Sequence, residues 1–483
     1  MEPWLRKRAR LTPDAPALVH DGAISSFATL DAASDLLARG LAARGITAND
    51  RVGLLASPSP QAIQVIHALQ YLGATLVPFN ARSPAREVRE LATIVRPTAV
   101  LHDSTTISLV SDLSPISTIA LGAIAAHPPP PCPETSPPSE LSGDAIHSML
   151  FTSGTTGRPK VACLTHANHE ASARASAQHL AISARDRWLL CMPLCHVGGL
   201  AVLLRSAITG FAVVLQERFD PDAVNRAIVD DSVSLVSVVP TMLVRMLDAL
   251  GARSYPETLR VVLTGGGPLA PALAARARTA GVPVVSTYGL TEAASQVATG
   301  RPGMQGEAAP MSATAIPGTD LRIREPDAAG IGEILVRGPT VMQGYFEDAV
   351  ASRAALREGW LHTGDAGRLE AGALTVVGRR SDLIVTGGEN VYPAEVERVL
   401  AQHPSVEDVA VYGIPDDEWG ECVVAAIVVA TGGFDPEAVR AWSGARLAGY
   451  KIPRVIRTVT TLPRTTSGKL RRAELRAVCE SAV

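Results

Sequence analysis

Short apolar runs alternate with segments of helical apolar spacing through much of this chain of 483 residues. Residues 52–55 are predicted to form a buried strand, residues 61–72 a helix and residues 74–78 the next strand. Further strands are predicted at residues 187–192, 212–215, 235–239, 259–263 and 282–287, and further helices at residues 221–230 and 270–280. Because strands separated by helices usually run in the same direction, the pattern favours an α/β fold with largely parallel sheets.

The character of the sequence changes after Met311, where residues 331–337 and 373–377 are predicted strands of a small β-rich unit. From about Ser381 onwards the chain has its own alternation of helices and strands. A chain of this length is too long for one ordinary domain. We therefore expect a large N-terminal domain of α/β sheets plus the small β-rich unit, residues 1–380, and a smaller α+β C-terminal domain, residues 381–483.

Composition excludes several classes of protein. A net charge of -3 and an aromatic content of 4% argue against a nucleic-acid partner. The six cysteines are widely spaced without a Cys-x-x-Cys pair, which fits a reducing cytosol better than a disulfide scaffold. The basic N-terminus lacks the apolar core of a signal peptide, and the most apolar stretch is too short to span a membrane. We expect a soluble cytoplasmic protein without stable membrane insertion, and homo-oligomerisation stays open.

Residues 152–160, with the sequence TSGTTGRPK, have the composition of a phosphate-binding loop. Glycines let the backbone approach a ligand closely, and backbone N–H groups and hydroxyls can then converge on anionic oxygens. The run differs from a Walker A loop, because two residues separate Gly154 from Gly157 and no Gly-Lys pair occurs. We therefore predict a nucleotide-binding loop of another kind.

Two further motifs each follow a predicted strand. In the segment 286–292, Tyr288 offers a flat face for a purine and Glu292 a carboxylate for a hard cation. Core packing for Tyr288 and a helix-start charge for Glu292 are equally good readings of that motif alone. In the segment 263–269, Gly265, Gly266 and Gly267 would let a flat ligand lie against backbone, although a plain strand-to-helix turn is the commoner reason for such glycines.

Two motifs lie nearer the C-terminus. Asp365 could accept hydrogen bonds from both hydroxyls of a ribose, or it could be a turn residue beside Gly364. Lys469 follows Ser467 and Gly468, and a lone lysine in such a place is by default a solvated surface cation. Cys191, Cys195 and His196 lack a fourth ligand at a recognisable spacing, so pocket or core roles are favoured over a metal site.

In their order along the chain, these motifs resemble those of the adenylate-forming superfamily, which includes acyl-CoA synthetases, firefly luciferases and peptide-synthetase adenylation domains. The matching stretches are residues 152–160, 287–292, 344–346, 360–365, 378–382 and 465–469. The resemblance extends from about residue 4 to about residue 475. It identifies the chain as a member of that superfamily.

The resemblance implies a two-step reaction that uses ATP, Mg²⁺ and coenzyme A. A carboxylate attacks the α-phosphate of ATP to give an acyl-adenylate and pyrophosphate, and a thiol then displaces AMP. Lys469 would bridge the carboxylate and the α-phosphate, Glu292 would serve Mg²⁺, and Thr152 and His196 are further candidate catalytic residues. The implied ATP-binding residues are Thr152, Ser153, Gly154, Thr155, Thr156, Gly157, Lys160, Gly265, Gly266, Gly267, Tyr288, Gly289, Thr291, Asp365 and Arg379.

The resemblance also implies that the C-terminal domain is mobile. It would swing about a hinge at Ser381 between the two half-reactions, and Gly387 and Gly388 would then lie at the tunnel for the coenzyme A thiol. Residues 193–200 would line the acyl pocket. They contain no carboxylate, which argues against an amino-acid substrate because its ammonium group would need one.

Residues 4–13, 193–210, 287–299 and 378–397 most resemble the 2-succinylbenzoate–CoA ligase family of menaquinone biosynthesis. Its substrate keeps a second carboxylate on the ring, so the pocket needs polar groups at its far end. The candidate pocket residues are His196, Gly199, Ser295 and Gln296, with Thr299 and Arg205 as further candidates. We interpret Arg205 as a surface helix residue in preference to a pocket residue.

Two alternatives stay open at this point. One is a general aryl- or medium-chain acyl-CoA ligase, and the other, of a different class, is a carrier-loading or non-catalytic acyl-binding module. The presence of Glu292 and Lys469 argues against a non-catalytic module. A luciferase-like oxygenase would use the same adenylation residues. The expected partners are therefore a small carboxylic acid, ATP and coenzyme A.

Overall fold

The computed structural model describes the chain except for a few short segments and single residues. The described residues are 1–111, 113–126, 140–152, 159–267, 269–303, 313–386, 389–416, 419–430, 433–465, 470–472, 474–475 and 477. The chain forms two compact units. The first comprises Met1–Gly266, Ala277–Asp320 and Val336–Leu361, and the second comprises Gly267–Arg276, Leu321–Leu335 and His362–Val483.

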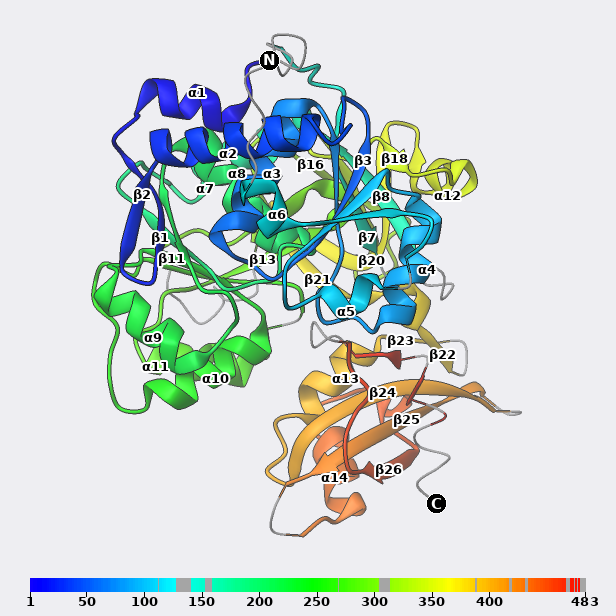
Figure 1. Cartoon of the computed structure of the whole chain (residues 1–483). Coiled ribbons are helices and arrows are strands. Elements are labelled where there is room, and N and C mark those ends of the chain that lie inside the picture. Colours follow the sequence, from blue (N-terminus) through cyan, green and yellow to red (C-terminus); the bar gives the residue numbers. More distant parts are fainter. Residues whose placement is uncertain are drawn as a thin grey trace. The chain divides into compact units, whose positions relative to one another are not determined.

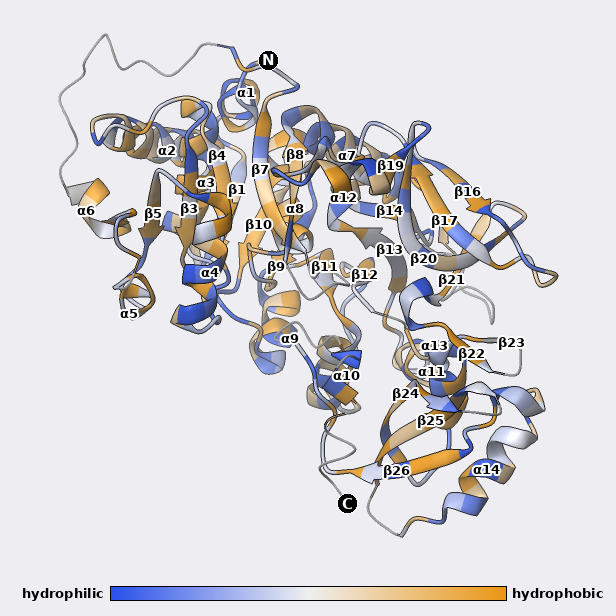
Figure 2. Cartoon of the chain, turned by 90° about the vertical axis from the view of Figure 1, so that its right-hand side faces the viewer, coloured by the Kyte–Doolittle hydropathy of each residue, from blue (hydrophilic) through white to orange (hydrophobic). Residues whose placement is uncertain are grey.

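The first unit contains a seven-stranded sheet (Figure 1). Its strands, in spatial order, are β18 (Gly344–Tyr345), β8 (Lys160–Thr165), β7 (Ile146–Thr152), β4 (Thr75–Pro78), β3 (Arg51–Leu55), β5 (Ala99–His102) and β6 (Ser117–Ala120). The strands from β7 to β6 pair in parallel, whereas β8 pairs antiparallel with both β7 and β18. Buried aliphatic side chains fill β3, β4 and β5, and β7 is largely hydrophobic in Figure 2.

A second sheet of the first unit carries most of the predicted parallel strands. In spatial order these are β2 (Ala23–Ser26), β1 (Pro16–His20), β10 (Ala212–Leu215), β9 (Arg187–Leu190), β11 (Leu235–Val238), β12 (Val261–Thr264), β13 (Val284–Leu290), β14 (Ser295–Thr299) and β15 (Ala313–Ala315). The run from β1 to β13 is parallel, and the strands at both ends are antiparallel. The prediction of an α/β fold with largely parallel sheets is confirmed.

Helices cover these sheets. Those of the first 300 residues are α1 (Trp4–Leu11), α2 (Phe27–Ala42), α3 (Pro60–Leu72), α4 (Ala85–Val95), α5 (Ile107–Val110), α6 (Leu121–Ala126), α7 (His166–His179), α8 (Val197–Thr209), α9 (Pro221–Asp230), α10 (Pro240–Leu250), α11 (Pro271–Thr279) and the 3₁₀ turn η2 (Thr291–Ala293). Helix starts follow ordinary capping chemistry, since Ser59 caps α3 and Thr165 forms a capping box with Asn168 at α7. Helix α8 is almost wholly buried, as expected of a helix that is apolar on every side.

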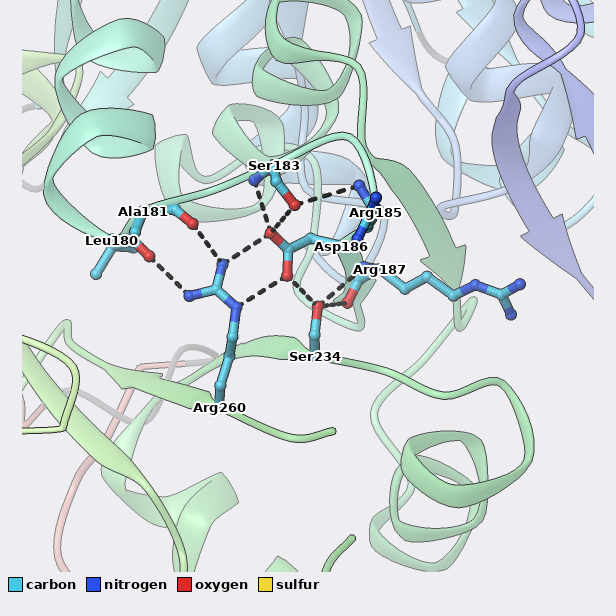
Figure 3. Close-up of polar contacts among 8 residues, drawn as sticks. All are labelled: Leu180, Ala181, Ser183, Arg185, Asp186, Arg187, Ser234 and Arg260. Carbon is cyan, nitrogen blue, oxygen red and sulfur yellow. Dashed lines mark hydrogen bonds and ion pairs between the residues drawn. The ribbon is translucent and has the colours of Figure 1, made fainter. Parts of the chain in front are cut away.

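An ion pair between a half-buried arginine and a buried aspartate joins the starts of three parallel strands (Figure 3). Arg260, just before β12, contacts Asp186, just before β9, through Nε–Oδ1 and Nη2–Oδ2 distances of 2.9 and 2.8 Å. Ser234, just before β11, donates to the same carboxylate at 2.7 Å. Burial alone would raise the pKa of Asp186, but the hydrogen bonds from Arg260, Ser183 and Ser234 outweigh it and lower that pKa. This network fixes the amino ends of the strands, whereas two of the predicted nucleotide-binding motifs lie at carboxyl ends of strands in the same sheet.

The chain after β15 adds β16 (Asp320–Arg324), β17 (Gly332–Arg337), α12 (Ala349–Ala355), β19 (Leu356–Arg357), β20 (Trp360–Glu370), β21 (Ala373–Arg379) and the 3₁₀ turn η4 (Arg380–Asp382). The second unit then has a five-stranded sheet in the order β23 (Glu389–Val391), β22 (Ile384–Thr386), β25 (Gly420–Val429) and β24 (Val406–Asp416), with β26 (Val455–Val459) paired to β25. Helices α13 (Pro393–Leu400) and α14 (Pro436–Gly444) and the 3₁₀ turn η5 (Gly449–Lys451) complete it.

Alternation along β24 gives this sheet two apolar faces. Val409 and Val411 belong to one buried cluster, whereas Ala410 and Tyr412 belong to another. Leu475, near the last of the described residues, is fully buried in the second cluster. Among the described residues, no helix has the length and hydropathy that a membrane crossing requires.

Candidate functional site

The predicted phosphate loop connects two antiparallel strands. Thr152 ends β7, Lys160 begins β8, and the two residues are paired across the sheet. Ser153, Gly154, Thr155, Thr156 and Gly157 lie outside the described residues. A strand–loop–strand arrangement differs from the strand–loop–helix of a Walker A site, in agreement with the spacing argument. Thr152 and Lys160 therefore stand together at the base of this loop.

Tyr345 contacts both Glu292 and Lys160. The Tyr345 hydroxyl donates to Glu292 Oε1 at 2.9 Å, and Lys160 Nζ lies 5.0 Å from the centroid of the Tyr345 ring. Glu292 lies in η2, directly after β13, beside Thr291, and both are half-buried. Sequence reasoning assigned no role to Tyr345, although it lies in one of the family-matching stretches, residues 344–346.

Gly265 and Gly289 occupy positions without room for a side chain. A Cβ at Gly265 would lie 2.7 Å from Thr287 Cγ2, and one at Gly289 would lie 1.8 Å from the Ser295 carbonyl oxygen. Gly289 and the half-buried Tyr288 lie within β13, which runs on to Leu290 because β14 pairs with it. Gly289 is therefore needed by the β13–β14 pairing itself, whatever its role toward a ligand.

Gly266, which has a φ of +78°, and Gly267 follow Gly265 at the carboxyl end of β12. Carboxyl ends of parallel strands are where ligands bind in open α/β sheets. Thr291 and Glu292 directly follow the next strand, β13. These two segments therefore reach the same edge of one sheet.

Asp365 and Arg379 form an ion pair in the second unit. Arg379 Nε lies 2.9 Å from Asp365 Oδ1, and the two residues are paired across β20 and β21. Arg379 Nη1 also donates to the Thr363 carbonyl oxygen at 2.9 Å. The alternative of a turn aspartate is wrong, because Asp365 is a buried strand residue.

The acyl-pocket candidates lie on two elements of the first unit. His196 is half-buried at the N-cap of α8, and Gly199 is buried in its first turn, where a Cβ would lie 2.3 Å from the Pro193 carbonyl oxygen. On β14, Gln296 is 1% exposed and its Nε2 donates to Thr299 Oγ1 at 2.9 Å. Ser295, half-buried with a φ of 104°, precedes it.

The interpretation of Arg205 as a surface residue is wrong. Its side chain is buried at 2% exposure in α8, with the guanidinium carbon 5.5 Å from the centroid of the Trp188 ring. Burial lowers its pKa from 12.5 to about 9. Within the described part of the chain, its Nε and Nη2 have no hydrogen-bond partner. A buried cation of this kind is costly unless an anion joins it, so Arg205 fits a site that an anionic group enters.

The remaining predicted residues belong to the second unit. Ser381 is exposed in η4, and its hydroxyl contacts Asp382 Oδ1 at 3.2 Å. Gly387 and Gly388, between β22 and β23, and Lys469 lie outside the described residues. Lys469 directly precedes Leu470, which bridges Arg464 in antiparallel fashion.

The residues that could hold Mg²⁺ centre on the Glu292 carboxylate. In the parts of the chain that are described, no group of three or more His, Cys, Asp or Glu residues is arranged to hold a metal ion. Mg²⁺ in nucleotide enzymes usually takes one or two carboxylates and completes its shell with phosphates and water. Glu292 supplies such a carboxylate and is hydrogen-bonded to Tyr345, whose ring contacts Lys160, so the residues fit a cation that arrives with a nucleotide. Burial raises the pKa of the Cys191 and Cys195 thiols to about 12.

Comparison with known proteins places the chain among nucleotide-dependent ligases. Residues 5–346 match the family described as AMP-binding enzyme, and residues 395–469 match the AMP-binding enzyme C-terminal domain. A 2-succinylbenzoate–CoA ligase of Bacillus cereus is 37% identical over 99% of this chain and 99% of its own length.

Solved structures with the same fold cover the whole chain. The o-succinylbenzoate CoA synthetase of Bacillus subtilis in complex with its acyl-adenylate intermediate has a TM-score of 0.92 at 36% identity, covering 99% of this chain and 98% of its own. The same enzyme in complex with ATP and magnesium ion has a TM-score of 0.88 at 35% identity, covering 99% of each chain. Similarity in both fold and sequence thus extends along the full length.

Proposed function

Since the chain belongs to the AMP-binding enzyme family, we propose that it is an ATP-dependent acid–CoA ligase that converts 2-succinylbenzoate to 2-succinylbenzoyl-CoA in menaquinone biosynthesis. The observation that carries the proposal is full-length identity of 37% to a ligase with that substrate. The adenylate-forming chemistry is supported by the family match and by the ATP, magnesium and acyl-adenylate complexes of the B. subtilis relative. We further propose that the protein acts in the cytoplasm.

The first half-reaction makes an activated acyl group. A carboxylate oxygen of the acid attacks the α-phosphorus of ATP, the bond from that phosphorus to the β-phosphate oxygen breaks, and pyrophosphate leaves. Thr152 and Lys160, with Ser153, Gly154, Thr155, Thr156 and Gly157, would hold the β- and γ-phosphates, and Glu292 would hold the Mg²⁺ that neutralises them. Mg²⁺ supplies charge stabilisation on the phosphate oxygens.

The nucleoside end of ATP would be held by residues of three of the motifs. Gly265, Gly266, Gly267, Tyr288 and Gly289 would flank the adenine, Thr291 would face the α-phosphate, and Asp365 with Arg379 would hold the ribose. The ion pair between Asp365 and Arg379 holds the carboxylate in one orientation, which suits a paired contact to two adjacent hydroxyls.

Lys469 would stabilise the charge that builds between the substrate carboxylate and the α-phosphate. In the second half-reaction the thiolate of coenzyme A attacks the acyl carbon, the bond to AMP breaks, and the thiol proton is lost to solvent. We propose that residues 381–483 form the mobile domain that turns about Ser381 between these steps, with Gly387 and Gly388 at the thiol tunnel, and that residues 1–380 bind ATP and the acid.

The pocket would hold the acid between α8 and β14. His196 and Gly199 at the start of α8, and Ser295, Gln296 and Thr299 on β14, would surround the succinyl arm and ring. Arg205 is the candidate partner of the second carboxylate, because it is a buried cation whose Nε and Nη2 lack a partner among the described residues. An acid without a second negative charge would leave that cation uncompensated.

The test is pyrophosphate release from ATP with a panel of acids, with and without coenzyme A. 2-Succinylbenzoate is expected to be preferred over benzoate and medium-chain fatty acids, and thioester is expected only with coenzyme A. Preference for benzoate or a fatty acid would overturn the acid assignment in favour of a general acyl-CoA ligase. Adenylate formation without transfer to coenzyme A would favour a carrier-loading module.

A further inference from the structure

Tyr345 is fixed in place by the strand that phosphate-loop residue Lys160 begins. It is paired with Ala162 across β18 and β8. On either side of Tyr345, the backbone N–H groups of Gln343 and Phe346 donate to the carbonyl oxygens of Cys163 and Val161, at 3.0 and 2.8 Å. The backbone position of Tyr345 is therefore set by β8.

The same segment also holds Glu292. The backbone N–H of Met342 donates to the Glu292 carbonyl oxygen at 2.8 Å, and the Tyr345 hydroxyl donates to Glu292 Oε1 at 2.9 Å. Both the backbone and the carboxylate of Glu292 are thus attached to residues 342–345. A hydrogen bond to one oxygen restricts the rotation of the carboxylate, and its second oxygen can accept a cation.

Lys160 contacts the other part of the same side chain. Its ammonium lies 5.0 Å from the centroid of the Tyr345 ring, within the range of a cation–π contact. One tyrosine therefore contacts an ammonium through its ring and a carboxylate through its hydroxyl. Both of these charged groups are proposed to serve the triphosphate and its cation.

We propose that Tyr345 is a positioning residue for the magnesium–nucleotide site, an inference that rests on the proposed function. It holds the Glu292 carboxylate and the Lys160 ammonium in fixed relation before ATP binds. Loss of the hydroxyl leaves the ring under Lys160 but releases the carboxylate. Loss of the hydroxyl weakens cation binding about tenfold, which corresponds to the loss of one hydrogen bond to a charged group.

The experiment compares Tyr345→Phe with Tyr255→Phe as a matched control. Tyr255 donates its hydroxyl to Asn225 Oδ1 at 2.6 Å on the first unit, so the control loses an equivalent hydrogen bond outside the site. Binding of Mn²⁺ in the presence of ATP is measured by electron paramagnetic resonance, together with the Mg²⁺ concentration for half-maximal pyrophosphate release. Thermal midpoints of both variants show whether folding is affected.

Tyr345→Phe is expected to weaken Mn²⁺ binding about tenfold and to raise the Mg²⁺ requirement by a similar factor, with the control unchanged. Tyr345→Leu, which also removes the ring under Lys160, is expected to raise the half-saturating ATP concentration as well. If Tyr345→Phe binds Mn²⁺ as the wild type does while Glu292→Gln is clearly defective, only the inference about Tyr345 is overturned. Wild-type Mn²⁺ binding by Glu292→Gln would instead overturn the proposed role of Glu292, and the inference with it.

Discussion

Arg472 forms an ion pair with Asp382, with 3.0 Å between Arg472 Nε and Asp382 Oδ2. The same guanidinium contacts both oxygens of Glu397, at 2.6 and 2.9 Å, and donates to the Val411 carbonyl oxygen at 2.7 Å. Burial alone would lower the pKa of Arg472, but the two carboxylates outweigh it and raise that pKa. Asp382 follows the proposed hinge residue Ser381, and Arg472 lies three positions after Lys469 in the sequence. One side chain thus joins the hinge turn to the segment next to the proposed catalytic lysine.

Replacing Arg472 with methionine is expected to destabilise the protein by about 3 kcal/mol, because two partly buried carboxylates lose their cation. It is also expected to slow adenylate formation more than thioester formation, since the segment beside Lys469 loses its anchor. Urea unfolding and separate assays of the two half-reactions measure these effects. Arg471→Met is the control, because Arg471 is exposed and pairs only locally with Glu474, and a change within about 0.5 kcal/mol is expected. Equal slowing of both half-reactions by Arg472→Met would contradict the anchoring role.

Arg205 allows a prediction in which stability and activity move in opposite directions. Arg205→Met removes a buried charge that lacks partners at Nε and Nη2 in the described structure, so the thermal midpoint is expected to stay or rise. The value of kcat/KM for 2-succinylbenzoate is expected to fall about 100-fold, because a hydrogen-bonded charge contact is lost. The value for 4-oxo-4-phenylbutyrate, which lacks the ring carboxylate, is expected to change little.

The matched control for Arg205 is Arg260→Met, which breaks the network in Figure 3. Arg260 is paired with Asp186, so its loss leaves a buried carboxylate and is expected to cost about 3 kcal/mol of stability. In Arg260→Met, the ratio of kcat/KM for 2-succinylbenzoate to kcat/KM for 4-oxo-4-phenylbutyrate should equal that of the wild type. If Arg205→Met keeps the wild-type ratio too, Arg205 does not contact the second carboxylate.

Lys469→Ala is expected to slow pyrophosphate release about 10²–10³-fold, the usual cost of removing one preorganised donor from a developing charge. Conversion of supplied 2-succinylbenzoyl-AMP to the thioester should be largely spared, because no phosphorus–oxygen bond is broken in that step. The two rates are measured separately by rapid quench. An equal loss in both half-reactions would refute the assigned role.

Local patterns predicted much of the first unit. Residues 52–55 were predicted as a strand and β3 is Arg51–Leu55, because an apolar run between a helix and a turn needs no distant information. Residues 221–230 were predicted as a helix and α9 is Pro221–Asp230. The extension of β13 through Tyr288 and Gly289 was not predicted, because it depends on pairing with β14 beyond a turn.

The site was predicted less completely, for a related reason. The motifs named Glu292 and Lys160 separately, but the tyrosine that contacts both lies 53 residues after Glu292, and no local pattern indicates such a contact. Arg205 was predicted to be a surface residue, although its neighbours in the sequence indicated burial. It is surrounded in sequence by Leu203, Leu204 and Ala207, and a helix that is apolar on all sides is buried on all sides.

Four histidines are buried together in the first unit and should make its stability sensitive to acid. His147 on β7 lies 4.9 and 5.1 Å, between ring centroids, from His169 and His166 of α7. Trp4 of α1 lies 5.2 Å from His147, between ring centroids, and His67 of α3 is 1% exposed.

Burial lowers the pKa of His67 and of His169 to about 3 and lowers those of His147 and His166. The cationic Arg205 of α8 adds to the shift at His169. The described hydrogen bonds of His169 and His166 are to neutral groups: the Ser148 hydroxyl lies 2.8 Å from His169 Nε2, and the Ala145 carbonyl oxygen lies 3.0 Å from His166 Nδ1.

Between about pH 6.5 and pH 3 the unfolded chain therefore binds protons that the folded chain does not, so stability falls as pH falls. The expected loss at pH 5 is roughly 2 kcal/mol for each of His67 and His169. His147→Phe keeps the ring contacts and removes one titrating group. It is expected to reduce the slope of unfolding free energy against pH by up to about 1.4 kcal/mol per pH unit in this window. Urea unfolding from pH 7 to pH 5 measures the slope, with His20→Asn, at a partly exposed ring, as the control. Identical slopes for His147→Phe and the control would show that the buried histidines do not set the acid sensitivity.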